Sequence, residues 1–168
     1  MQLIPLREED IKEFKSSMQE AFQYWYESVC WESDEILPES HIDRSLNKEN
    51  SYAYEMIDDE WKLLWWAIVT INENQHNELD FLFVKVWIQS KWVWQAIWKE
   101  IEKIHSDTKV WETVTPYFDK RNIHFYVNKL KFHIVEYFNE KHIDPNTPEE
   151  EYMAWDGWMF WFQKVMNP

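Results

Sequence analysis

A strand, a short loop and a long amphipathic helix follow one another in the middle of the chain, and this segment most constrains the fold. Residues 79–84 are an apolar run typical of a strand, and residues 90–105 carry apolar side chains at helical spacing. The start of such a helix aims free backbone N–H groups and the positive end of its dipole at an anion. Trp92 and Trp94 stand where glycine would let the backbone approach that anion closely. The segment therefore predicts an anion-binding turn between a strand and a helix.

The rest of the chain predicts one mixed α/β sheet with helices on its faces, in a single domain over residues 1–168. Residues 30–46 indicate a loop with a short helix, and Asp119 is well placed to cap the helix that follows it. The periodic segments are helices at 10–22, 90–104 and 119–130, and strands at 52–57, 62–71, 78–84, 109–115, 132–138 and 159–166.

The chain contains one glycine, Gly157, and 13 tryptophans, whereas average composition gives about a dozen glycines at this length. Turns that need positive φ cost other residues about 1 kcal/mol or more each, so the scarcity is unexpected in a strand-rich fold. One hypothesis is that tryptophan replaces glycine, through engineering or because codon UGA, which some genetic codes read as glycine, was translated as tryptophan. It concerns Trp61, Trp65, Trp66, Trp87, Trp92, Trp94 and Trp158, whereas Trp98 and Trp111 resemble ordinary core aromatics.

The formal net charge of −14 disfavours nucleic acid and anionic membranes as partners, because both reward clusters of Lys and Arg. It is compatible with attraction of a cationic amine. The longest apolar run, residues 63–69, is too short to span a bilayer. The single cysteine, Cys30, excludes an intrachain disulfide and fits a reducing compartment. The N-terminus turns acidic at once, unlike a signal peptide, so we expect a cytoplasmic protein. The histidines have no ligand spacing, so no metal site is expected.

Two motifs, in the right order and on the right elements, resemble those of the GNAT acyltransferase superfamily. The first, Gln89-x-x-Trp92-x-Trp94, lies where that family has Gln/Arg-x-x-Gly-x-Gly/Ala. Tryptophan thus occupies both glycine positions of the loop. The resemblance extends over residues 50–140 and implies a GNAT-like sheet, mostly antiparallel, with two splayed parallel strands at its centre.

The second motif lies about thirty residues later and is similar to the family's Asn-x-x-Ala-x-x-x-Tyr-x-x-x-Gly-Phe. Asp119 stands at the Asn position, Asn122 at the Ala position and Tyr126 at the Tyr position. Lys131 then stands where Gly would precede Phe132, with one residue more than usual after the tyrosine.

The resemblance implies transfer of an acetyl group from acetyl-CoA to a primary amine by direct attack, with no acyl-enzyme and no metal. Backbone groups of Phe83 and Val84 would pair with the pantetheine arm, and Tyr126 would protonate the departing thiolate. Asp119 and Asn122 would lie beside the cofactor. The pyrophosphate would be held by the backbone of Gln89, Ser90, Lys91, Trp92, Val93, Trp94 and Gln95.

The attacking amine must first lose a proton, so a base is expected near the start of the central strand. Glu78 lies six residues before Val84, where several relatives carry a glutamate base. Asp80 and Glu112, both on predicted strands, are the alternative bases, and a surface role for Glu78 is a further one.

Trp92 and Trp94 would put two indoles into the phosphate space, and an indole face offers an anion no favourable contact. We therefore expect weak or absent CoA binding by this chain. The alternatives are a GNAT-fold protein with a blocked CoA site that serves as a binding or regulatory module, and an unrelated Trp-rich ligand-binding domain. The amine acceptor, a small molecule or a peptide, stays open, and a homodimer is compatible with the resemblance.

Overall fold

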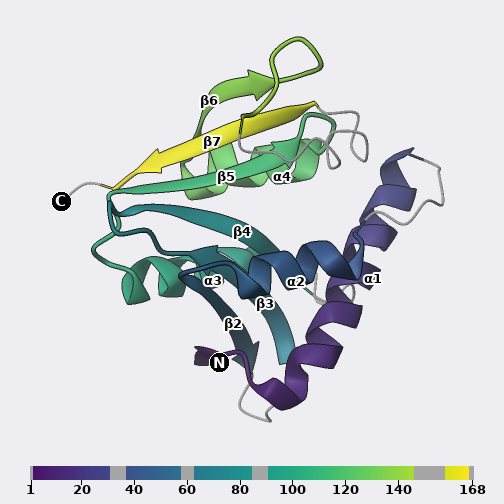
Figure 1. Cartoon of the computed structure of the whole chain (residues 1–168), viewed down its shortest axis with the longest axis vertical. Helices are drawn as coiled ribbons and strands as arrows, with labels where there is room; N and C mark the ends of the chain where they lie inside the picture. The colour runs from purple at the N-terminus through teal and green to yellow at the C-terminus, as the bar shows by residue number, and fades with distance from the viewer. Residues whose placement is uncertain (1, 31–36, 58–62, 85–90, 146–157, 167–168) are drawn as a thin grey trace. The chain divides into compact units, whose positions relative to one another are not determined.

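The computed structural model describes residues 2–30, 37–57, 63–84, 91–145 and 158–166 (Figure 1). Contacts divide the chain into two compact units. The first comprises residues 1–72 and 79–106, and the second comprises residues 73–78 and 107–168. The prediction of a single domain over residues 1–168 stays a prediction.

The first unit combines antiparallel strands with three helices. Strand β2 pairs with β1 on one side and β3 on the other, both in antiparallel register. A short 3-10 helix, η1 (Glu8–Asp10), precedes the first long helix. The strands are β1 (Gln2–Pro5), β2 (Ser51–Ile57), β3 (Leu63–Thr70) and the later part of β4 (His76–Val84), and the helices are α1 (Ile11–Cys30), α2 (Glu39–Asn47) and α3 (Lys91–Ile104).

Aromatic rings from a helix and two strands form the core of this unit. Trp66 on β3 stacks on Phe83 of β4, with centroids 4.9 Å apart. Phe14 of α1 meets both rings edge-on, at 6.0 and 5.7 Å. Trp66 and Phe14 are fully buried and Phe83 is 3% exposed. Such buried edge-to-face and stacked pairs hold α1 against β3 and β4.

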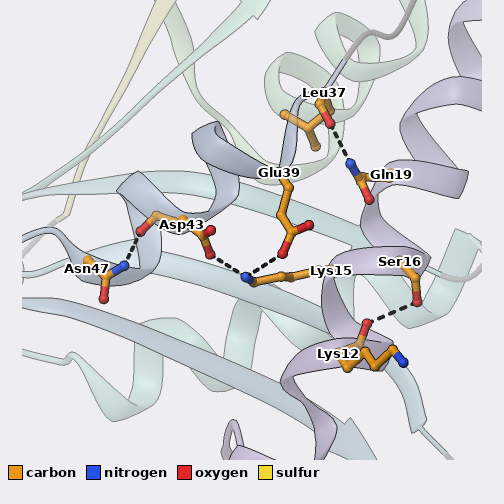
Figure 2. Close-up of polar contacts among 8 residues, drawn as sticks. All are labelled: Lys12, Lys15, Ser16, Gln19, Leu37, Glu39, Asp43 and Asn47. Carbon is orange, nitrogen blue, oxygen red and sulfur yellow. Dashed lines mark hydrogen bonds and ion pairs between the residues drawn. The ribbon is translucent and has the colours of Figure 1, made fainter.

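Helices α1 and α2 are joined by polar contacts along their facing sides (Figure 2). The Lys15 ammonium reaches the carboxylates of Glu39, at 2.8 Å, and Asp43, at 2.5 Å. The Gln19 side-chain amide donates to the carbonyl of Leu37, at 3.1 Å. Apolar contacts with Ile42 of α2, which is fully buried, complete the packing.

The alternation of side chains along β4 is interrupted between Asp80 and Phe83. Asp80 accepts a hydrogen bond from the Thr70 hydroxyl, at 2.7 Å, and Phe83 stacks on Trp66. Thr70 and Trp66 share one face of β3, which is in regular register with β2 from Thr70 to Trp65. Asp80 and Phe83 are three positions apart, so in a regular strand they would face opposite sides. The two contacts therefore indicate that the alternation of side chains along β4 changes between Asp80 and Phe83.

The second unit is a β-sheet segment covered by a short irregular helix. Strand β7 lies between β5 and β6, antiparallel to both. The beginning of β4 pairs with β5 in parallel register over residues 76–78 and 110–112. The elements of this unit are β5 (Val110–Pro116), α4 (Lys120–His124), the π-helix η2 (Phe125–Leu130), β6 (His133–Phe138) and β7 (Met159–Val165).

The strand order is β1-β2-β3-β4-β5-β7-β6, so the sheet is mixed and has seven strands, as the predicted α/β class requires. The helices and strands of the sequence analysis are confirmed within a few residues, except that α1 continues to Cys30. Strand β1 was missed because it is short, ends in Pro5 and carries little apolar alternation. The turn predicted at residues 58–61 lies outside the described residues.

Candidate active site

Tyr126 lies in a buried aromatic setting in the second unit. Its ring contacts Phe132 and Phe162, with centroids 5.7 and 5.5 Å away, and only 7% of the residue is exposed. Burial raises the pKa of the Tyr126 phenol above its ordinary value, while a hydrogen bond with the Thr113 side chain lowers it and the charge of Asp119 raises it further. The phenol is therefore protonated at neutral pH, as a proton donor must be.

Asp119 caps the helix that leads to Tyr126. Its carboxylate accepts a hydrogen bond from the Asn122 backbone N–H, at 2.9 Å, as expected of an N-cap residue. The carboxyl is 2% exposed, and burial raises its pKa to about 6 against the opposing effect of that hydrogen bond. The structure thus brings Asp119, Asn122 and Tyr126 together on consecutive turns, α4 and η2.

The one extra residue after Tyr126 coincides with a π-helical turn. In η2 the hydrogen bonds span five residues, so that the N–H of Lys131 reaches the carbonyl of Tyr126. A π-turn holds one residue more than an α-turn. Lys131 then adopts the left-handed region, with φ 66° and ψ 31°. The Phe132 N–H also donates to the Tyr126 carbonyl, at 2.9 Å. The position that is glycine in the family motif therefore has the backbone that favours glycine.

Glu78, the predicted base, lies beside Glu112. The two residues are register partners on the parallel strands β4 and β5, so their side chains share one face. Glu112 also accepts a hydrogen bond from the Gln163 amide, at 2.7 Å, and His76 lies 3.7 Å from it. Thr113, the next residue on β5, faces the opposite side, toward Tyr126. Glu78 and Tyr126 therefore belong to opposite faces of this part of the sheet.

The remaining strand residues of the predicted site lie in the first unit. The Phe83 side chain is part of the core, so its predicted cofactor contact concerns its backbone only. Val84 is the last residue of β4. Asp80, an alternative base, is engaged by the Thr70 hydroxyl at 2.7 Å and by the Lys48 ammonium at 3.6 Å. These bonds tie Asp80 to its neighbours in the first unit.

The anion-binding loop falls largely outside the described residues. Gln89 and Ser90 belong to the part that the structure leaves out, and α3 begins at Lys91. Trp92 and Trp94 therefore belong to the first turn of α3, together with Val93, and Gln95 follows them. Helical backbone does not require glycine, so any effect of the two tryptophans on an anion would come from their bulk. The predicted roles of Gln89, Ser90 and residues 91–95 stay predictions.

Thr113 is the residue near Tyr126 that sequence reasoning missed. Strand β5 carries buried threonines at Thr113 and Thr115, 6% and 3% exposed, on the face that also buries Trp111. A buried hydroxyl in an apolar strand needs a hydrogen-bonding partner, and this alternation was the available signal. Sequence alone could not identify the partner as Tyr126.

Within the described residues, no group of three or more His, Cys, Asp or Glu side chains could hold a metal ion. In the same part of the chain, every helix is too short or too polar to cross a membrane.

Comparison with known proteins shows one relative over almost the whole chain. No family model matches the sequence. The uncharacterized protein YrkN of Bacillus subtilis (strain 168) is 36% identical over 169 residues, which cover 96% of this chain and 91% of that protein.

Solved structures of N-acetyltransferases have a similar fold. The spermidine N-acetyltransferase from Vibrio cholerae, in complex with CoA and spermine, matches with a TM-score of 0.69 and 10% identity over 98% of this chain and 94% of that one. The PaiA N-acetyltransferase from Thermoplasma acidophilum, in complex with coenzyme A, matches with a TM-score of 0.67 and 15% identity over 98% of both chains. The ribosomal-protein-S18-alanine N-acetyltransferase from Escherichia coli gives a TM-score of 0.68 at 8% identity, over 99% of this chain and 94% of that one. The chain therefore belongs to the same family as YrkN, and its fold is that of the GNAT N-acetyltransferases.

Proposed function

We propose that this protein transfers an acetyl group from acetyl-CoA to a primary amine. Tyr126 carries the proposal: it stands at the Tyr position of the motif that the sequence resembles, and it is a buried phenol that stays protonated at neutral pH. The fold supports the reaction class, since structural neighbours are N-acetyltransferases, several with CoA bound. Neighbours act on amines as different as spermidine and a ribosomal-protein alanine, so the acceptor class of this chain is proposed no more finely than a primary amine.

The proposed site for the pyrophosphate is the start of α3. The helix begins at Lys91 and is 14 residues long, so its first turn has free N–H groups and the positive end of a dipole. Bound there, acetyl-CoA would supply the activated acyl group, and the backbone of Phe83 and Val84 would hold its pantetheine arm. Trp92 and Trp94 in that turn oppose close approach, and we expect them to weaken binding.

The chain's own residues then divide the proton transfers. Glu78 accepts the proton of the amine, directly or through water, which leaves a neutral nitrogen that can attack the thioester carbonyl. As the carbon–sulfur bond breaks, Tyr126 gives its phenolic proton to the sulfur and later regains one from solvent. The nitrogen that attacked releases its second proton to solvent, which leaves a neutral amide. The products are an amide and a free thiol, with no acyl-enzyme.

The two proposed proton carriers come from different faces of the β4–β5 pair. Glu78 lies on one face and Tyr126 on the other. The two proton transfers are also separate in time, because the amine is deprotonated before it attacks and the thiolate is protonated as the tetrahedral intermediate collapses. Glu112 is the alternative base, because it shares the face of Glu78.

Calorimetric titration of acetyl-CoA tests the cofactor site, with Trp92→Gly/Trp94→Gly as the comparison. We expect the double variant to bind more tightly than the parent chain, by up to roughly a thousandfold if the indoles cost about 4 kcal/mol. A screen of amines with Tyr126→Phe as control then tests turnover, which this variant should lose. If neither chain binds acetyl-CoA, the proposal is wrong and a non-catalytic binding module becomes the better description.

We also propose a cytoplasmic location. It is supported by the single cysteine, which fits a reducing compartment. Fractionation of the source cells with an antibody to the protein tests it, and recovery outside the cytoplasmic fraction would contradict it.

A further inference from the structure

Aromatic rings lie around Tyr126 in the described part of the chain. The rings of Phe132 and Phe162 pack against the Tyr126 ring, and their side chains have no hydrogen-bonding atoms. Phe125, the preceding residue, adds a third ring at 5.7 Å. Loss of the phenolic proton would leave a negative charge in this apolar setting, where an unsolvated charge is costly. A donor aimed at the phenolic oxygen is therefore needed for Tyr126 to act as an acid.

Thr113 is in position to be that donor. It lies on β5 directly across from Phe162 of β7, the same residue whose ring contacts Tyr126. The threonine is 6% exposed, and its side chain hydrogen-bonds the phenol. When the phenolic proton points toward a departing sulfur, the phenolic oxygen can only accept in this bond, so the Thr113 hydroxyl is the donor. A donor to the charged oxygen lowers the pKa of Tyr126.

Asp119 affects the pKa of Tyr126 in the direction opposite to Thr113. Its buried carboxylate at the start of α4 raises the pKa of Tyr126 through its charge. The Asn122 N–H bonds that carboxylate at 2.9 Å, which holds it at the helix cap. Negative charge on the phenolic oxygen is thus stabilised by the Thr113 hydroxyl from β5 and destabilised by the Asp119 carboxylate at the start of α4.

We propose that Thr113 is a positioning residue that orients the Tyr126 phenol and stabilises the phenolate left when the proton moves to sulfur. The inference rests on the proposed acetyltransferase function. In the step concerned, the carbon–sulfur bond breaks, its electron pair stays on sulfur, the phenolic proton goes to that sulfur, and the negative charge passes to the Tyr126 oxygen. The Thr113 hydroxyl keeps its proton throughout and donates a stronger hydrogen bond to the charged oxygen.

Three variants separate positioning from packing. Thr113→Val removes the hydroxyl and keeps the shape, Thr113→Ser restores a hydroxyl, and Thr115→Val is the matched control. Thr115 lies two positions along the same strand, on the same face and 3% exposed. Each variant is made in the full chain with a fluorinated tyrosine at position 126, whose more acidic phenol can be titrated by ¹⁹F NMR without turnover.

We expect Thr113→Val to raise the phenol pKa by about one unit, since a hydrogen bond to a charged group is worth about that much. Thr113→Ser should recover most of the shift and Thr115→Val should show none. An unchanged pKa in Thr113→Val, or an equal shift in Thr115→Val, overturns the inference.

The kinetic measurement is made on the same variants with the natural tyrosine. Thr113→Val should lower kcat about tenfold with KM unchanged, and Thr113→Ser should recover it. An unchanged kcat overturns the inference. Because the ¹⁹F titration needs no substrate, a protein inactive toward every amine would refute the proposed function and leave the Thr113–Tyr126 bond to be judged by its own readout.

Discussion

Lys131 holds a backbone conformation that a side chain with a Cβ adopts at a cost. Its φ of 66° is one of three positive values at non-glycine residues among the described residues, the others being Asn50 and Gln75. Lys131→Gly should therefore raise the free energy of unfolding by about 1 kcal/mol. Urea denaturation measures the change.

The control for this substitution is Lys131→Ala. It keeps the Cβ and removes only the bond from the ammonium to the Asn128 carbonyl, at 3.0 Å. Equal stability of the Gly and Ala variants would show that backbone strain at this position is negligible.

Asp119 makes stability depend on pH in a direction unusual for a carboxyl. Its pKa is about 6 in the folded chain, against an ordinary 3.8. The protonated Asp119 carboxyl is favoured in the folded chain. Its contribution to the free energy of unfolding is therefore complete below about pH 4 and is lost as the pH rises through 6. Asp119→Asn keeps a good N-cap without the charge, so it should stabilise the protein at pH 7.5 by up to about 3 kcal/mol.

Urea denaturation of both chains at several pH values tests this effect. The difference between them should be near zero at pH 4 and level off above pH 6. A difference that does not change with pH would mean that the carboxyl of Asp119 titrates normally.

At the scale of elements, the π-helix η2 predicts tolerance to a deletion. Removing Lys129, an exposed residue of η2, should convert the turn to α-helix and cost little stability. Removing Lys99, which is exposed in the regular helix α3, should cost at least about 2 kcal/mol because it displaces the buried Ile101. Thermal unfolding compares them, and equal losses would contradict the interpretation of η2 as an accommodated extra residue.

A partly buried ion pair joins the segment between β1 and α1 to β2. Arg7 donates to Glu55 at 2.7 Å, and Glu55 is fully buried on β2. Burial raises the pKa of Glu55 and the bond with Arg7 lowers it. Arg7→Met should lower the Tm strongly at pH 7, because it leaves a buried carboxylate unpaired.

The double variant Arg7→Met/Glu55→Met is the control for this pair. It removes both charges, so we expect it to recover much of the Tm. A double variant no more stable than Arg7→Met alone would show that the packing around Arg7, and not the charge of Glu55, accounts for the loss.

For the whole molecule, the net charge of −14 predicts electrostatic attraction of a cationic acceptor. If the protein acetylates a polyamine or another cationic amine, kcat/KM should fall as salt is raised from 50 to about 500 mM, because screening shortens the reach of the field. A neutral amine of similar size is the control. An equal fall of kcat/KM for the cationic and the neutral amine would show that the net charge does not attract the acceptor.

The sequence predicted most of the fold because runs of apolar residues identify the buried strands and the helical spacing of apolar residues identifies α3. It also identified Asp119 as a cap, a role that depends on local residues alone. It could not predict the change of face along β4 or the contact of Thr113 with Tyr126, because each depends on which residues meet in the fold. It showed the extra residue after Tyr126, but not the π-helix η2 that holds it. The hypothesis that tryptophan replaces glycine stays untested, although Trp65 and Trp66 lie fully buried in a regular strand. A peptide sequence from the source organism would decide it.

The two units share β4, and this affects the order in which they can fold during synthesis. Residues 73–78 belong to the second unit but are made before residues 79–106, which complete the first. As the ribosome works from the N-terminus, the first unit can close while the partners of residues 76–78, on β5, do not yet exist. The second unit cannot be expressed by simple truncation, since a fragment beginning at residue 107 lacks its strand from β4. Any attempt to isolate it must graft residues 73–78 onto the later segment.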